Sequence, residues 1–174
     1  MIRHLVLAAS LAIASSAAAA APSFNCAKAA TPVEKSICGN SRLADQDAAI
    51  AQQYNAVRGK LDADAAKSLT ADQRYFLGVR DKIYAEPFSG STPIKEITTS
   101  MDYRLRFLKA INPQPPAGFV GKWKNIEGEI EITQAADGKL FVSANSAQPY
   151  NGRWVCDLSG SAVVSGDTLS VTYQ

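Results

Sequence analysis

Apolar residues follow two different periods along this chain, and the change falls near residue 112. Over residues 31–111 they recur at helical spacing, whereas from residue 118 onward they alternate every second position, as strands do when one face is buried. The segment 112–117 between them is rich in proline and can continue neither a helix nor a sheet. The pattern predicts an α+β protein with a small α-helical bundle over 21–111, a stiff linker over 112–117 and a small antiparallel β-domain over 118–174.

The first predicted helix is short, and its ends are visible in the sequence. Thr31 can cap the helix, and Pro32 stands at the first helical position, where its missing N–H has no cost. Glu34 completes a Thr-x-x-Glu capping box, and Gly39 ends the helix.

Three longer amphipathic helices are predicted after it. One follows Ser41, and its core stripe has a single polar member, Asp47. The next is predicted to start after Thr70, with Gln73 as its capping-box partner, and the last covers residues 92–108. Helices with short connections bury their apolar stripes most simply against one another, which predicts a helical bundle.

The second half predicts an antiparallel meander, either as a partial barrel or as a sandwich. Isoleucine and glutamate alternate over 129–132, a turn is expected at 136–138, and alternation resumes over 140–144. A second turn is expected at Gly166-Asp167. One interpretation of Trp123 and Trp154 is a platform on which sugars stack. The favoured interpretation is that they form the core of the β half, because tryptophan in a small β-domain is usually buried.

The first twenty residues are typical of a secretory signal peptide. A positive start is followed by the apolar segment 5–14, which is too short to span a bilayer, and by a run of small residues. Cleavage is predicted before Ala21. The residues before Cys26 do not fit a lipid-anchoring site, so the mature protein is expected to be periplasmic or secreted and not membrane-spanning.

Charge and histidine content exclude several classes of function. The chain has 18 basic and 16 acidic residues, and a formal charge of +2 does not favour nucleic-acid binding. His4 is the sole histidine, and it lies in the leader. Without imidazole, and with no calcium-loop or thiolate-cluster pattern, we expect no enzymatic activity, no metal site and no cofactor.

The charge is unevenly divided between the two halves. Residues 21–111 contain 13 basic and 10 acidic residues, which gives +3, and residues 118–174 contain 4 basic and 6 acidic residues, which gives −2.

The three cysteines divide into a pair and a single thiol. Cys26 and Cys38 flank the first short helix of a secreted chain, so they are predicted to form a structural disulfide. A redox-active pair more often has the Cys-x-x-Cys spacing. Cys156 is free, or bonded to a second copy in a dimer, or paired with a residue outside this chain.

The densest polar and aromatic segment of the chain is 73–81. On a helix, Arg74 and Asp81 point the same way, and Gln73 and Arg80 form a neighbouring row. One interpretation is a recognition surface for a carboxylate or a partner protein. The favoured alternative is that one or both arginines pair with acids on adjacent helices and set the register of the bundle.

Three alternating glutamates, Glu127, Glu129 and Glu131, share one face of a predicted strand. Their spacing invites comparison with the carboxylate pair of a glycosidase. A general acid needs burial to raise its pKa, which a short exposed strand does not provide. The solvated outer face of a sheet is therefore the favoured interpretation.

Four segments of the first half resemble the N-terminal domain of LprI-type lysozyme-inhibitor proteins. The resemblance extends over 23–108, and its most specific part is the cysteine-flanked helix. The matching segments are Ser23 to Ala29, Thr31 to Cys38, Leu43 to Asp47, and Gln73 to Asp81. The resemblance implies a secreted or envelope helical domain that binds host lysozyme, with no catalytic residues.

The chain departs from the family pattern at two positions. Phe76 stands where tryptophan is common, and Ile83 stands where the family has a cysteine. A second disulfide to the fourth helix is therefore absent, and packing of Ile83 against Met101 or Leu105 is expected to replace it. The leading hypothesis is a binding protein that occludes a muramidase. The alternative is an envelope scaffold module that binds peptidoglycan or a membrane-protein partner.

Overall fold

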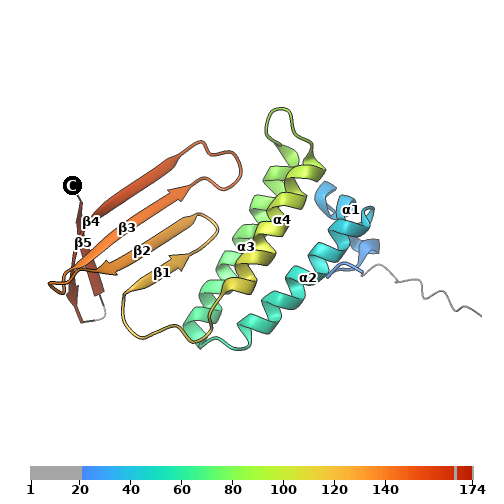
Figure 1. The fold of residues 1–174 in the computed structure, drawn as a ribbon. Helices are drawn as coiled ribbons and strands as arrows, with labels where there is room; N and C mark the ends of the chain where they lie inside the picture. The colour runs from blue at the N-terminus through green and yellow to red at the C-terminus, as the bar shows by residue number, and fades with distance from the viewer. Residues whose placement is uncertain (1–20, 167, 174) are drawn as a thin grey trace, which may run out of the picture.

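A computed structural model describes residues 21–166 and 168–173. The predicted signal peptide, residues 1–20, lies outside the described residues, as does Asp167 of the second predicted turn. Helices precede a five-stranded antiparallel sheet (Figure 1), which confirms the α+β prediction. After the short 3-10 helix η1 (Cys26–Lys28), the helices are α1 (Pro32–Cys38), α2 (Ser41–Arg58), α3 (Ala63–Ala85) and α4 (Pro93–Ala110).

The capping box predicted for α1 is confirmed. Thr31 Oγ1 accepts a hydrogen bond from the backbone N–H of Glu34 at 3.2 Å, and Glu34 Oε2 accepts one from the backbone of Thr31 at 2.9 Å. The side chains of Asn40 and Thr92 cap α2 and α4 by accepting hydrogen bonds from the backbone N–H groups of Leu43 and Lys95. Side-chain oxygens thus satisfy N–H groups that the first turn of a helix leaves without an internal partner.

The start predicted for the third helix is wrong, because α3 begins eight residues earlier, at Ala63. Asp62 is its cap, and Asp62 Oδ1 accepts a hydrogen bond from the backbone of Ala65 at 2.8 Å. Thr70 lies inside the helix, where its hydroxyl donates to the carbonyl of Ala66 at 2.7 Å. A threonine can satisfy its hydroxyl in this way within a helix, so a Thr-x-x-Gln pattern does not require a helix start.

Thr31→Ala is expected to lower the free energy of unfolding by about 1 kcal/mol, because the Glu34 N–H loses its acceptor. Urea denaturation measures this, and Thr31→Ser is the control that keeps the cap. A value for Thr31→Ala equal to wild type would contradict the assignment of Thr31 as the cap.

The pKa of the Glu34 carboxyl is lowered, first by the hydrogen bond from the Thr31 backbone and then by the one from Ala30. The contribution of Glu34 is therefore present above its ordinary pKa and lost as pH falls through the lowered one.

The apolar core of the helical half lies between α2, α3 and α4. Helix α4 packs against both α2 and α3, and α1 contacts α2 and α3 near one end of the bundle (Figure 1). Ile83 is buried in the same core as Met101, with Leu105 packed against it. The largest fully buried side chains are Phe76, Ile37, Leu43, Ile97, Met101, Leu108 and Val33. Among the residues that the structure describes, no helix has the length and apolar character needed to cross a bilayer.

The sheet is a meander in the order β1-β2-β3-β4-β5, with every neighbouring pair antiparallel. Its strands are β1 (Gly121–Lys124), β2 (Gly128–Gln134), β3 (Leu140–Ala147), β4 (Val155–Ser165) and β5 (Thr168–Tyr173). Ile130 pairs with Ala144, which pairs with Leu158, so these side chains share one face. This apolar face is hollowed into a groove that also includes Trp123 and Val171.

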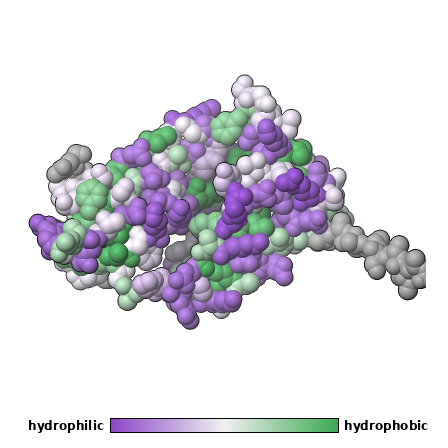
Figure 2. Space-filling view, in the orientation of Figure 1, coloured by the Kyte–Doolittle hydropathy of each residue, from purple (hydrophilic) through white to green (hydrophobic). Residues whose placement is uncertain are grey.

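The helices contact the loop end of the sheet and do not cover its apolar face, on which Ile132 and Val142 are buried while Ile130 and Leu158 are exposed. Ile126, in the β1–β2 connection, and Tyr150, between β3 and β4, pack against the helical core. The backbone N–H of Ile126 also donates to Asp72 Oδ1 on α3, at 3.1 Å. Figure 1 shows the loops of the sheet directed at α3 and α4, and Figure 2 shows hydrophobic residues at the surface of the sheet half.

The prediction that Trp123 and Trp154 form the core of the β half is wrong. Trp123 is 45% exposed and Trp154 is 43% exposed, and Trp154 lies just before β4. A sheet buries its apolar face only where a second layer covers it. In the part of the chain that the structure describes, the helices contact loops instead, so the aromatic rings stay accessible.

Candidate functional site

The disulfide between Cys26 and Cys38 holds the N-terminal segment to the end of α1. The two Cα atoms are 5.8 Å apart, and the bond closes a loop with a sequence separation of 12 residues. The loop contains η1 and nearly all of α1. The bridge therefore fixes a segment whose own core would be too small to order it.

Arg80 and Asp47 form an ion pair between α3 and α2. Arg80 Nη1 lies 3.4 Å from Asp47 Oδ1, and the two residues are 6% and 7% exposed. Asp47 Oδ2 also accepts hydrogen bonds from the backbone N–H and the hydroxyl of Ser23, at 2.7 and 2.6 Å. Asp47 thus joins two helices and the N-terminal segment. Arg80 pairs with an acid on an adjacent helix, as the favoured interpretation of segment 73–81 predicts.

A second buried arginine, Arg104 on α4, forms polar contacts with α3. Its guanidinium forms an ion pair with Asp72, and its Nε donates to Gln73 Oε1 at 2.8 Å. The guanidinium carbon lies 5.2 Å from the ring centre of Phe76 and 4.9 Å from that of Phe107. Cation–π contacts on aromatic rings help to compensate for the removal of this charge from water.

Sequence reasoning missed Asp72 and Arg104, although both lie near residues that it selected. Asp72 is adjacent to Gln73, and it bonds both Arg104 and the backbone of Ile126. A usable signal was the position of Arg104 within the apolar stripe of α4, between Met101 and Leu108. A charged residue on a buried stripe requires a partner, and that requirement predicts an acid on a facing helix.

The other two candidate residues of segment 73–81, Asp81 and Arg74, lie at the surface. Asp81 is exposed and forms an ion pair with Arg80 Nε at 3.6 Å. Arg74 is exposed and lines a groove on α3 together with Tyr75, Lys82 and Tyr150. The structure therefore separates the four candidates: Arg80 and Gln73 contact neighbouring helices, whereas Arg74 and Asp81 face outward.

Glu129 and Glu131 project from one face of β2 beside lysines of β1. Lys122 Nζ lies 3.6 Å from Glu129 Oε1 and 3.3 Å from Glu131 Oε2, and Lys124 also bonds Glu129. The pKa of Glu129 is lowered, chiefly by the hydrogen bond from Lys124. A glycosidase acid requires a raised pKa, so this carboxylate has the opposite property. Glu127 lies in the connection before β2 and not on the strand.

Cys156 is exposed on the same sheet face as Leu158, and it is the cysteine without a disulfide in the described chain. A bond from Cys156 to a second copy stays a prediction. Residues 21–166 and 168–173 contain no group of three or more cysteine, histidine or acidic residues arranged to hold a metal ion.

Together, the disulfide and the arginine network tie the helical half into one unit that extends from η1 to α4. Residues 26–105 match the family model of the lysozyme inhibitor LprI. The resemblance to the LprI-type domain is thereby confirmed for this segment. Comparison with curated proteins and with solved structures gave no match.

The LprI match covers the elements that carry these contacts. It begins at Cys26 of the disulfide and ends at Leu105 in α4, so it includes both buried arginines and their acids. It does not extend to the linker or the sheet. Any role of the β half must therefore be argued from its own geometry.

Proposed function

We propose that this protein is a non-enzymatic binding protein that inhibits lysozyme by covering the substrate cleft of the enzyme. The LprI match over 26–105 carries the proposal. Inhibition of this kind needs a rigid complementary surface and no covalent step. The proposal places the mature protein in the periplasm or outside the cell, where a disulfide such as Cys26–Cys38 persists.

The contacts of the helical half support a preorganised binding surface. The disulfide joins η1 to α1, the Arg80–Asp47 and Arg104–Asp72 pairs join α2, α3 and α4, and α1 packs against α2 and α3. A surface that is ordered before binding loses less conformational entropy when the complex forms. Tight binding could then come from a modest contact area.

Long-range charge does not support attraction of a basic lysozyme to the helical half, which carries +3. The β half carries −2, but Glu129 and Glu131 are each paired with a lysine of β1. We therefore propose that local shape complementarity supplies most of the affinity. Binding should then depend only weakly on salt.

The test is a titration of the purified mature protein into c-type lysozyme while the clearing of a cell-wall suspension is followed. The clearing rate is expected to fall in proportion to added protein and to level off near equimolar ratio. A stoichiometric inhibitor should give the same inhibition after short and long preincubation, whereas an enzyme acting on lysozyme would give inhibition that grows with time. Full clearing at a large molar excess would refute the proposal.

Sedimentation with purified sacculi distinguishes the alternative function, an envelope scaffold that binds peptidoglycan. An inhibitor directed at lysozyme is expected to stay in the supernatant when no lysozyme is present. Sedimentation with sacculi combined with no effect on clearing would favour the scaffold.

A further inference from the structure

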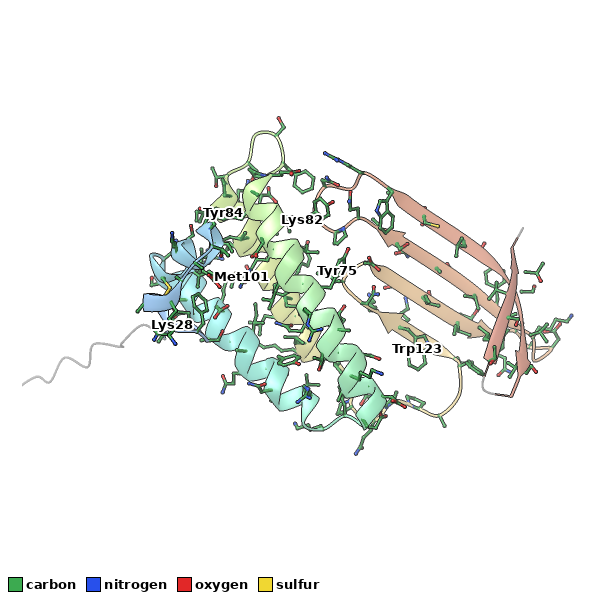
Figure 3. The ribbon with its side chains drawn as sticks, turned by 180° about the vertical axis from the view of Figure 1, so that it is seen from behind. Lys28, Tyr75, Lys82, Tyr84, Met101 and Trp123 are labelled. Carbon is green, nitrogen blue, oxygen red and sulfur yellow. A yellow bond between two sulfur atoms is a disulfide. The ribbon has the colours of Figure 1, made fainter. Side chains whose placement is uncertain are left out.

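A groove of about 460 Å³ lies on the side of α3 that faces the sheet. Its floor includes Ala71 and Gly78, and its walls include Arg74, Tyr75 and Lys82 from α3 and Tyr150 from the β3–β4 connection. Tyr75 and Lys82 lie along the sheet side of the helix, away from Lys28 (Figure 3). The groove therefore combines aromatic and cationic groups at the junction of the two halves.

Gly78 opens the middle of this groove. It lies in the interior of a 23-residue helix, where glycine lowers helix stability relative to alanine. A Cβ atom at Gly78 would meet nothing within 4 Å, so no neighbour in the fold requires a glycine here. Arg74, Tyr75 and Lys82 lie three or four positions from Gly78, so they neighbour it on the helix surface. The missing side chain of Gly78 leaves a gap among them. A glycine in this position permits close approach of a ligand to the helix.

The cations that border the gap are not neutralised within the described chain. Arg74 has no hydrogen bond or ion pair there, and Lys82 Nζ lies over the ring of Tyr150, 4.6 Å from its centre. A carboxylate near the groove is that of Glu127 from the β1–β2 connection, which interacts with Tyr75. The pKa of the Tyr75 hydroxyl is raised, first by burial and then by the Glu127 carboxylate. The groove thus has two cations available for an anionic ligand.

We propose that this groove binds an extended acidic segment of a partner protein, with one carboxylate at Arg74 and a second at Lys82. Eight residues along a helix correspond to about 12 Å. Acidic residues four apart on an extended peptide are separated by about 13 Å. The open backbone at Gly78 would accommodate the peptide between these two contacts, and Tyr75 and Tyr150 would pack beside it.

The experiment follows the backbone amide NMR signals of the isotopically labelled mature protein as the peptide Gly-Glu-Ser-Thr-Ser-Glu-Gly is added. Signals of residues 71–82 and 148–152 are expected to shift in a saturable manner. The peptide with glutamine in place of both glutamates should bind about tenfold more weakly, because each exposed ion pair contributes about threefold. Equal binding of the two peptides, or shifts spread over the whole surface, would overturn the proposal.

Variants separate the groove from general electrostatic attraction. The double variant Arg74→Gln with Lys82→Gln should weaken peptide binding about tenfold. The control is Lys28→Gln with Lys60→Gln, which removes the same charge from exposed sites outside the groove. The control should bind the peptide within twofold of wild type. Glu127→Gln should strengthen binding. If the control pair weakens binding as much as the groove pair, the proposal fails.

Two substitutions at Gly78 test helix stability and peptide binding separately. Gly78→Ala is expected to raise the melting temperature by about 2–4 °C, since alanine favours the helix and meets no neighbour. Gly78→Leu extends into the groove and should weaken peptide binding about tenfold without loss of helix signal in circular dichroism. Unchanged binding by a folded Gly78→Leu variant would overturn the proposal.

The proposal does not rest on lysozyme inhibition, because the peptide titration is performed without lysozyme. If sacculi sediment the protein through Arg74 and Lys82 while the acidic peptide does not bind, the groove belongs to an anionic glycan and the peptide proposal is wrong. Loss of lysozyme inhibition in the clearing titration would leave the peptide result unaffected.

Discussion

Asp47→Ala is expected to lower the free energy of unfolding by about 3–5 kcal/mol, because it leaves the buried guanidinium of Arg80 without its buried partner. The substitution also removes the acceptor of the Ser23 backbone and hydroxyl hydrogen bonds. Urea denaturation at neutral pH provides the measurement. Asp81→Ala is the matched control, since its carboxylate pairs with the same arginine but is 46% exposed, and it should cost less than about 1 kcal/mol.

A double variant separates two contributions to the free energy of unfolding: that of the Arg80–Asp47 pair itself, and the cost of leaving Arg80 buried without Asp47. Asp47→Leu combined with Arg80→Met replaces both charges by apolar groups and is expected to recover most of the stability lost in Asp47→Ala. If Asp47→Ala costs no more than Asp81→Ala, then the Arg80–Asp47 pair does not organise the bundle.

Removal of the Cys26–Cys38 disulfide is expected to lower the free energy of unfolding by about 3 kcal/mol. On the chain-entropy model, the bridge restricts the unfolded chain, so opening it favours the unfolded state. The comparison uses Cys26→Ser with Cys38→Ser, both in a Cys156→Ser background that prevents thiol exchange. The Cys156→Ser single variant is the control and should match wild type, because its side chain is exposed and unpaired in the described chain.

The same measurement can show whether the disulfide and Asp47 act together. Ser23 lies three residues before Cys26 and bonds Asp47, so both features hold the N-terminal segment against α2. Their effects are expected to be less than additive, since loosening the segment by either change weakens the other contact. A loss below about 1 kcal/mol on removing the disulfide would mean that the unfolded chain gains little freedom from it.

Local signals in the sequence predicted most of the fold. The capping box at Thr31, the proline after Thr92 and the alternation over 129–132 each depend on neighbours within a few residues, and all three appear in the structure. The start of α3 was missed because Thr70 can satisfy its hydroxyl inside a helix as well as at a cap. Local patterns fail where one side chain has two satisfactory local conformations.

The candidate site was predicted less completely, because its contacts join residues far apart in the chain. Arg80 was selected, but Asp47, 33 positions away, was visible only as a polar interruption of a core stripe. Arg104 and Asp72 are 32 positions apart and were not selected. Their pairing follows from the rule that a buried charge needs a partner, but the partner can be chosen only when the helix packing is known.

The sequence by itself determined the element types, the cysteine pair, the LprI resemblance and the unequal charge of the two halves, because all of these depend on composition and short-range spacing. Only the tertiary structure showed that Arg80 is buried and that Arg74 lies at the surface. It also showed that the sheet contacts α3 through its loops. Trp123 stays exposed for the same reason: hydrophobicity favours burial, but only a neighbouring layer can provide it.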